Sequence, residues 1–243
     1  MGKEILFLIT ARGGSKGLPG KNLRRLSGLS LVGFKARSAR RSKHNARLII
    51  STDDADICTE AETHGAEAPF MRPAALATDS ASSDEVVLHA MDYLESEENR
   101  RYDAIMVLEP SSPFARGEDY DRAIELFERV DASCVLGMRE TEVNSMFVGP
   151  LADDGKVDQI IQGFAGVGDL RRQAFQPEYT MNGSLYLVDW NVMRTTGSIY
   201  GAPNRTYGYK MDRLHSIEIE TIYDLKMAES CVHEGLLDMT DWQ

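Results

Sequence analysis

The sequence predicts an α/β fold with a doubly wound, mostly parallel, Rossmann-like sheet. Strand-like apolar runs alternate with segments whose apolar residues recur at helical spacing, and this order is typical of parallel sheets. A length of 243 residues suits one domain, which we expect to span 1–243 with a full core. The alternation fails between about 140 and 180, so an inserted segment is expected there.

In the first third of the chain, strands and helices are expected to alternate regularly. The expected elements are a strand at 5–10, a helix at 30–43, a strand at 47–51, a helix at 54–64 and a short strand at 67–71. Leu31, Val32 and Ala39 lie on the inward face of the first helix. Gly65 ends the second helix, because glycine readily adopts the left-handed conformation that follows helix ends.

Capping signatures locate two later helices. Ser82 and Glu85 have the spacing of a capping box, in which each side chain bonds the backbone of the other residue. Thr221 and Asp224 open a C-terminal helix with the same spacing. A further helix is expected around the apolar stripe at 120–127.

Three more strands are expected, at 104–108, 132–138 and 184–189. The first of them is nearly all apolar, which predicts a central place in the sheet. Between the last two of these strands, at about 140–180, glycine and aspartate are frequent and hydrophobic periodicity weakens. That pattern is compatible with a β-hairpin excursion, a lid or a dimerisation arm.

The overall charge disfavours a nucleic-acid partner. The chain carries a formal charge of −11 at pH 7, and an acidic protein repels a polyanion. Residues 1–50 nevertheless hold 12 lysines and arginines against one acidic residue, Glu4. This imbalance predicts a local anion site in an otherwise acidic protein.

Cysteine usage favours a reducing compartment. Cys58, Cys134 and Cys231 lie far apart and form no C-x-x-C pair, which argues against a zinc ribbon and a disulfide framework. A cytoplasmic location is therefore expected. No stretch approaches the roughly 20 apolar residues that cross a bilayer, so no membrane association is expected.

The stretch 10–22, which reads TARGGSKGLPGKN, is the most informative part of the sequence. Its glycines allow sharp turns and the close approach of a ligand, and Arg12, Lys16 and Lys21 add three positive charges. Backbone N–H groups and fixed cations after a strand suit a polyphosphate. The alternative, a flexible surface loop, is disfavoured by this density of glycine and cations.

This stretch is neither of the two common phosphate-binding motifs. A Walker A motif requires Ser or Thr after its lysine, whereas Asn22 follows Lys21, and 13–17 lack the G-x-G-x-x-G spacing. The missing dinucleotide fingerprint disfavours a nicotinamide-dependent oxidoreductase. Two more polar loops, at 52–54 and 109–113, are expected at the same sheet edge, where α/β proteins bind ligands.

The motifs resemble those of the acylneuraminate cytidylyltransferases, the CMP-sialic acid synthetases. The resemblance follows the family order over nearly the whole chain: RGGSKGLPGKN at 12–22, STDD at 51–54, RPAALATD at 72–79 with serines at 82–83, LEPSSP at 108–113, RQ at 172–173, NGSLY at 182–186 and SIEIET at 216–221. The related CMP-Kdo synthetases typically have Tyr and Arg where this chain has Gly13 and Gly17, which favours the branch that uses nonulosonic acids.

The resemblance implies a reaction between CTP and an acidic nine-carbon keto sugar. The anomeric hydroxyl of the sugar would attack the α-phosphorus of CTP and give a CMP-sugar and pyrophosphate. The alternatives are an enzyme of the CMP-Kdo type, another sugar-acid cytidylyltransferase, and a catalytically weakened homologue that binds nucleotide or sugar. The family also implies a homodimer, with the segment at about 140–180 serving dimerisation and the sugar side of the site.

The same resemblance assigns roles to individual residues. The expected catalytic residues, at the triphosphate, are Lys21, Arg12 and Lys16. The expected nucleotide-binding residues are Ala11, Arg12, Gly13, Asn22, Arg72 and Ser83. The expected sugar-binding residues are Glu109, Arg172, Gln173, Asn182 and Gly183. The arginine among the latter suits a carboxylate, which it can grip through two parallel hydrogen bonds.

The chain departs from the family pattern in two respects, which involve three glutamates. The family's metal-binding aspartates are replaced by Glu218 and Glu220, which would share one face of a strand and bind Mg²⁺ or Mn²⁺, or serve only as salt-bridge partners. Glu109 stands where sialate enzymes often have glutamine. An anion beside the pocket of an acidic sugar leads to the hypothesis that the preferred sugar is not ordinary N-acetylneuraminate.

Overall fold

A six-stranded mixed sheet forms the centre of the protein, in a computed structural model that describes residues 2–171 and 174–243. The strands are β1 (Ile5–Thr10), β4 (Asn45–Ser51), β5 (Ala104–Leu108), β6 (Cys134–Glu140), β7 (Tyr179–Asp189) and β8 (Thr206–Lys210). Their spatial order is β4-β1-β5-β7-β6-β8. Only β7 runs against its neighbours, since the pairs of β1 with β4 and β5 and of β6 with β8 are parallel. The expected mostly parallel sheet is confirmed, with β5 at its centre.

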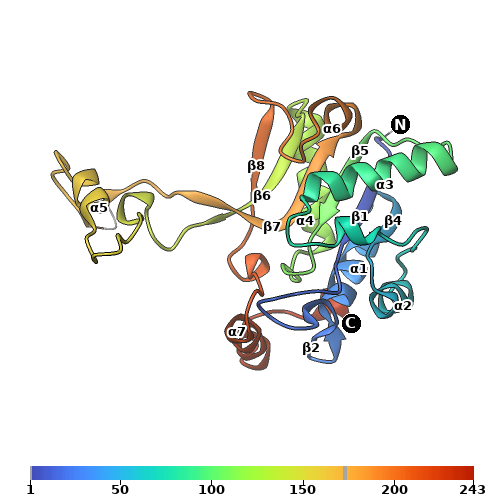
Figure 1. The fold of residues 1–243 in the computed structure, drawn as a ribbon, viewed down its shortest axis with the longest axis horizontal. Coiled ribbons are helices and arrows are strands. Elements are labelled where there is room, and N and C mark those ends of the chain that lie inside the picture. Colours follow the sequence, from blue (N-terminus) through green and yellow to red (C-terminus); the bar gives the residue numbers. More distant parts are fainter. Residues whose placement is uncertain (1, 172–173) are drawn as a thin grey trace.

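Helices cover both faces of this sheet (Figure 1). They are α1 (Leu31–Arg41), α2 (Ala55–Thr63), α3 (Ser83–Glu97), α4 (Gly117–Arg129), α5 (Asp158–Gly163), α6 (Trp190–Thr196) and α7 (Ile222–His233). A small antiparallel pair, β2 (Arg25–Leu26) and β3 (Leu29–Ser30), precedes α1. None of the helices in the described ranges combines the length and the apolar character needed to cross a membrane.

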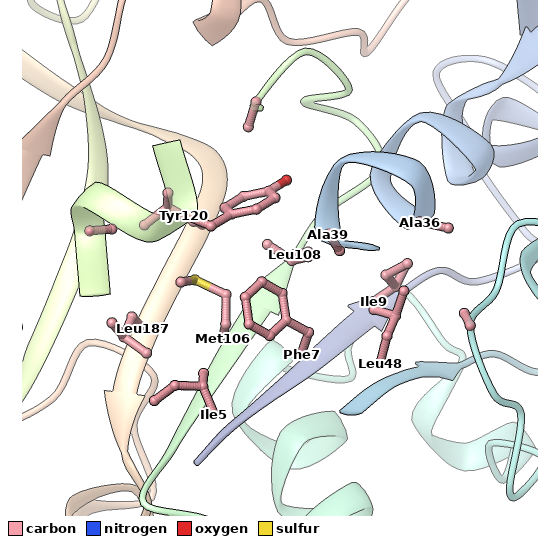
Figure 2. Packing of buried hydrophobic residues seen from close by; sticks show 14 of the residues in the cluster. Ile5, Phe7, Ile9, Ala36, Ala39, Leu48, Met106, Leu108, Tyr120 and Leu187 are labelled. Carbon is pink, nitrogen blue, oxygen red and sulfur yellow. The ribbon is translucent and has the colours of Figure 1, made fainter. Parts of the chain in front are cut away.

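Alternate residues of β1 point into two separate cores, which makes the fold doubly wound. Phe7 packs under α1 and α4, where its ring meets that of Tyr120 edge to face at 5.7 Å between centroids (Figure 2). Leu6 and Leu8 face the opposite side, where α3 and α6 contribute Met91 and Trp190. Strands buried on both faces require continuous apolar runs, and β1 and β5 have them.

A third core joins the loop at 11–22, which we call the first loop, to the C-terminal part of the chain. Leu18, Ile219 and Leu225 lie in this cluster, together with Phe114 and Trp242. Thr221 caps α7 through a capping box with Asp224, as its sequence predicts. The third core therefore fixes the segment 217–221 beside the first loop, and this juxtaposition builds one wall of the site.

Most of the sequence-based element boundaries are confirmed to within about two residues. The strand expected at 67–71 is wrong, because only a single bridge joins Glu67 to Ile49. The strand expected at 184–189 begins at residue 179, since β7 continues outward together with β6. Ser82 and Glu85 form the predicted capping box of α3.

Residues 141–171 and 174–178, which we call the arm, leave the body of the protein between β6 and β7 and carry α5 at their far end (Figure 1). Phe147 holds the arm together by stacking against Phe164 and Phe175, at 5.4 and 5.7 Å between ring centroids. Several large apolar side chains of the arm stay exposed, among them Leu151 and Ile161.

Candidate active site

A cleft of about 450 Å³ opens at the carboxyl ends of β1 and β5. Loops from strands that are distant in sequence converge there, as is usual at this edge of a doubly wound sheet. Eight residues singled out from the sequence line the cleft: Arg12, Lys16, Lys21, Asn22, Arg72, Ser83, Glu109 and Glu220. The structure therefore brings together residues that are spread over most of the chain.

Two glycines let the first loop, residues 11–22, pack tightly against its neighbours. A Cβ atom on Gly17 would lie 2.6 Å from the carbonyl oxygen of Glu220. A Cβ atom on Gly13 would lie 2.7 Å from the carboxylate of Asp54, and the Gly13 N–H donates to Asp53 at 3.0 Å. Both positions thus require glycine because of a close approach to other parts of the protein.

Each cation of the first loop already has a carboxylate partner. Arg12 and Lys16 both bind Asp79, at 2.8 and 2.5 Å, and these two contacts lower the pKa of the aspartate. Lys21 binds Glu220 at 2.7 Å, and its side chain is 13% exposed against 79% for Lys16. The loop is therefore held in shape by ion pairs that an incoming polyanion can replace.

Hydrogen bonds to the main chain fix the base of the loop. Asn22 is buried, and its amide donates to the carbonyl oxygen of Arg12 at 2.9 Å. Ala11 is also buried, and its N–H donates to the carbonyl oxygen of Ser51 at 3.1 Å. Ala11 is not among the residues that line the cleft.

Arg72 and Ser83 also line the cleft. Arg72 is buried, donates to the hydroxyl and carbonyl oxygens of Ser51, and has its pKa lowered to about 10 by burial. Ser82 accepts the N–H of Glu85 as the cap of α3, while Ser83 is exposed at the start of the helix and lines the cleft.

The turn at Asn182 and Gly183 lies beside Glu109. Gly183 has φ 62°, and a Cβ atom there would lie 2.9 Å from Glu109 Oε2 and 3.2 Å from Glu218 Oε1. Asn182 is fully buried, donates to the hydroxyl of Ser216 at 3.1 Å and does not line the cleft. Its side chain therefore shapes the turn from inside. The candidates Arg172 and Gln173 lie outside the described residues.

Glu218 and Glu220 occupy an extended segment that leads into α7, not the strand that was expected. Ile219 between them is fully buried, and its N–H donates to the carbonyl oxygen of Ser111 at 2.7 Å. Glu220 reaches Lys21, whereas Glu218 lies near Glu109. The segment is not a strand because its backbone hydrogen bond goes to the loop at Ser111 and not to a neighbouring strand.

Three carboxylates collect at this end of the cleft. Burial raises the pKa of Glu109 to about 7, and repulsion by Glu218 and Glu220 adds to the rise while Lys35 opposes it. Burial also raises the pKa of Glu218. In the part of the chain that the structure describes, no group of three or more His, Cys, Asp or Glu side chains has the arrangement of a metal site. A divalent cation fits here only if phosphate oxygens complete its shell, which is how Mg²⁺ commonly binds.

Sequence reasoning gave no role to Asp79 and did not single out Lys35. Asp79 ends the RPAALATD motif, seven positions after Arg72, the arginine predicted to bind the nucleotide. Its place in that motif is the signal that could have found it. Lys35 lies four residues after Leu31 and four before Ala39, so the helical period placed it on the inward, apolar face of α1. A lysine at such a position is the signal that could have found it.

The doubly wound sheet and the cationic, glycine-rich cleft define a nucleotide-binding α/β protein. The cytidylyltransferase family model matches residues 6–144, and the chain belongs to this family. The sequence-based resemblance is thereby confirmed at the level of the family.

Two relatives match almost the whole chain. The post-translational flagellin modification protein B of Campylobacter coli is 30% identical over 98% of this chain and 99% of its own. The CMP-N,N'-diacetyllegionaminic acid synthase of Legionella pneumophila is 28% identical over 93% of this chain and 95% of its own. A solved CMP:2-keto-3-deoxy-manno-octonic acid synthetase, complexed with CTP, shares the fold with a TM-score of 0.66 and 15% identity over 96% of this chain and 99% of its own.

Gly17→Ala should lower the free energy of unfolding by about 1–3 kcal/mol, because the new methyl group meets a backbone oxygen that cannot move away cheaply. Urea unfolding measures the change. Gly14→Ala is the matched control, since no heavy atom lies within 4 Å of the added Cβ, and it should stay within about 0.5 kcal/mol of the original chain. Equal effects of the two substitutions would contradict the close approach of the loop to the segment 217–221.

Proposed function

We propose that this cytidylyltransferase activates a nonulosonic acid with CTP and forms a CMP-sugar and pyrophosphate. The observation that carries the proposal is the set of three cations, Arg12, Lys16 and Lys21, that line one cleft together with Arg72. The name of the Legionella relative supports the sugar class. The order of motifs along the chain supports the same reading.

The first loop supplies the positive charge that the reaction needs. Phosphoryl-type transfers depend on positioning and on charge neutralisation more than on covalent catalysis. The anomeric oxygen forms a bond to the α-phosphorus as the bond from that phosphorus to the oxygen that bridges the α- and β-phosphates breaks. Pyrophosphate leaves, and the proton of the sugar hydroxyl passes to the solvent. Lys21, the least exposed cation of the loop, stabilises the charge that develops on the phosphates. Arg12 and Lys16 bind the outer phosphates after they release Asp79.

The remaining cleft residues bind the rest of the nucleotide. Arg72 has five N–H donors, of which two contact Ser51, so others are available to a base or ribose. Ser83 offers its hydroxyl from the start of α3. Asn22 and the main chain at Ala11 and Gly13 hold the loop in its binding shape.

The acceptor sugar lies beyond the phosphates, next to Glu109 and the turn at Asn182 and Gly183. Glu109 accepts hydrogen bonds from a donor on the sugar, and Gly183 leaves room where a side chain would not fit. Arg172 and Gln173 remain our candidates for the sugar carboxylate or acyl group.

Mg²⁺ or Mn²⁺ is the proposed cofactor, held by Glu218 and Glu220 together with phosphate oxygens. The cation would neutralise charge on the triphosphate and lessen the repulsion among the carboxylates that surround it. Glutamate reaches one methylene further than the aspartate usual in the family. Release of Glu220 from Lys21 would free the lysine for the phosphates and the glutamate for the cation.

We also propose that the protein is a cytoplasmic homodimer that assembles through the arm. Leu151 and Ile161 are 71% and 56% exposed, and apolar side chains gathered on a projecting segment favour burial against another chain. A second copy would supply that cover. Cys58 and Cys134 are free and buried, which suits a reducing compartment.

Lys21→Ala should lower the rate of pyrophosphate release by about 10²–10³-fold, because a charge fixed beside the reacting phosphates is lost. The assay uses CTP, Mg²⁺ or Mn²⁺ and a panel of keto-acid sugars. Lys226→Ala, which removes an exposed lysine of α7, should leave the rate unchanged. CTP binding without pyrophosphate release on any sugar would favour a binding protein over an enzyme.

Asp79→Asn should tighten CTP binding up to about fivefold at low salt, because the triphosphate no longer displaces a carboxylate from Arg12 and Lys16. Calorimetry measures the affinity, and the gain should shrink as salt screens the charges. Asp56→Asn, an exposed position in the first turn of α2, serves as the control. Weaker CTP binding by Asp79→Asn would contradict a competing role.

Light scattering should give a mass of about twice 27.1 kDa. Leu151→Asp combined with Ile161→Asp should shift the protein to the monomer, because charges on the arm cannot be buried against a second copy. Tyr223→Asp, at a 78% exposed position of α7, should leave the mass unchanged. A monomeric original chain at micromolar concentration would refute the dimer.

A further inference from the structure

Lys35 is a fully buried lysine on the inward face of α1. Its ammonium donates to the carbonyl oxygen of Ser184 at 2.8 Å and to the hydroxyl of Tyr120 at 3.4 Å. A buried cation is costly unless it is paired and hydrogen-bonded. The fold therefore gives this ammonium specific partners, although burial lowers the pKa of Lys35 to about 7 and the residue is not among those that line the cleft.

The main-chain partner of Lys35 belongs to an interruption in the sheet. The pairing of β6 with β7 passes from Leu136–Tyr186 directly to Met138–Met181, so residues 182–185 form a bulge. Gly183 at the centre of the bulge has φ 62°. The ammonium of Lys35 thus donates to a carbonyl within this bulge, at Ser184.

The same bulge touches Glu109. A Cβ atom on Gly183 would meet Glu109 Oε2 at 2.9 Å, one residue before the carbonyl that Lys35 binds. Burial lowers the pKa of Lys35, and Glu109 opposes that lowering more strongly than Asp119 does. Lys35 in turn opposes the rise that burial causes in the pKa of Glu109. The lysine and the glutamate are therefore joined both through the bulge and through their charges.

We propose that Lys35, which is itself anchored by the Ser184 carbonyl oxygen, is a positioning residue for the acceptor pocket and holds Glu109 in place by balancing its charge from behind. This inference rests on the proposed function. It explains how a carboxylate can line a pocket for an acidic sugar, since the pair carries little net charge. Glu109 then selects acceptors that present an N–H or O–H donor to it.

The test is a double-mutant cycle with the original chain, Lys35→Met, Glu109→Gln and the variant with both changes. Pyrophosphate release gives kcat and KM for the acceptor sugar, calorimetry gives CTP affinity, and urea unfolding gives the midpoint. Lys35→Met should lower kcat/KM for the sugar at least about tenfold when Glu109 is present, because a carboxylate is left uncompensated. In the Glu109→Gln background, the same change should cost no more than about twofold.

Two controls separate this effect from general damage. CTP affinity should stay within about twofold in Lys35→Met, because the cations of the first loop are untouched. Lys226→Met, at an exposed lysine, should match the original chain in every assay.

Equal losses in both backgrounds would overturn the proposal, because they would show a structural role independent of Glu109. No loss in either background would overturn it as well. If Lys35→Met fails to fold, recovery of folding in the double variant supports the charge pairing, and failure of both overturns it. If the original chain releases no pyrophosphate with any acceptor, the proposed function fails. Non-additive changes of the urea midpoint in the cycle would then still support the pairing of Lys35 with Glu109.

Discussion

The close contact between Gly17 and the carbonyl oxygen of Glu220 is the constraint on which the site depends. It joins the first loop, which follows the carboxyl end of β1, to the segment that leads into α7. Leu18 and Ile219 bury the same junction in the third core, and the ion pair of Lys21 with Glu220 spans its polar side. Without this junction the cationic loop and the proposed metal-binding acids would not face one cleft.

Two carboxylates partly balance the three cations of the first loop. Asp79 holds Arg12 and Lys16, and Glu220 holds Lys21. Such pairing keeps long side chains near their working positions, which reduces the reorganisation that substrate binding requires. A triphosphate with its metal ion offers more charge than a lone carboxylate, so it can replace these partners. The same principle, applied in the protein interior, accounts for Lys35 behind Glu109.

Sequence reasoning predicted the sheet, the helices on both of its faces and the first loop. These features follow from hydrophobic periodicity and from the chemistry of short sequence motifs. The apolar runs of β1 and β5 and the capping boxes at Ser82 and Thr221 are local signals. It could not predict that Asn182 turns its amide toward Ser216, or that Glu218 and Glu220 leave the sheet, because bonds to distant residues decide both. The partners of Asp79 also depend on how two loops meet in space.

A crystal structure of the protein with CTP tests the central claim most directly. The account predicts that the triphosphate lies within hydrogen-bond distance of Arg12, Lys16 and Lys21, that Asp79 has released its two partners, and that the α-phosphorus faces Glu109. A nucleotide bound elsewhere, with the ion pairs of Asp79 and Glu220 intact, would contradict it.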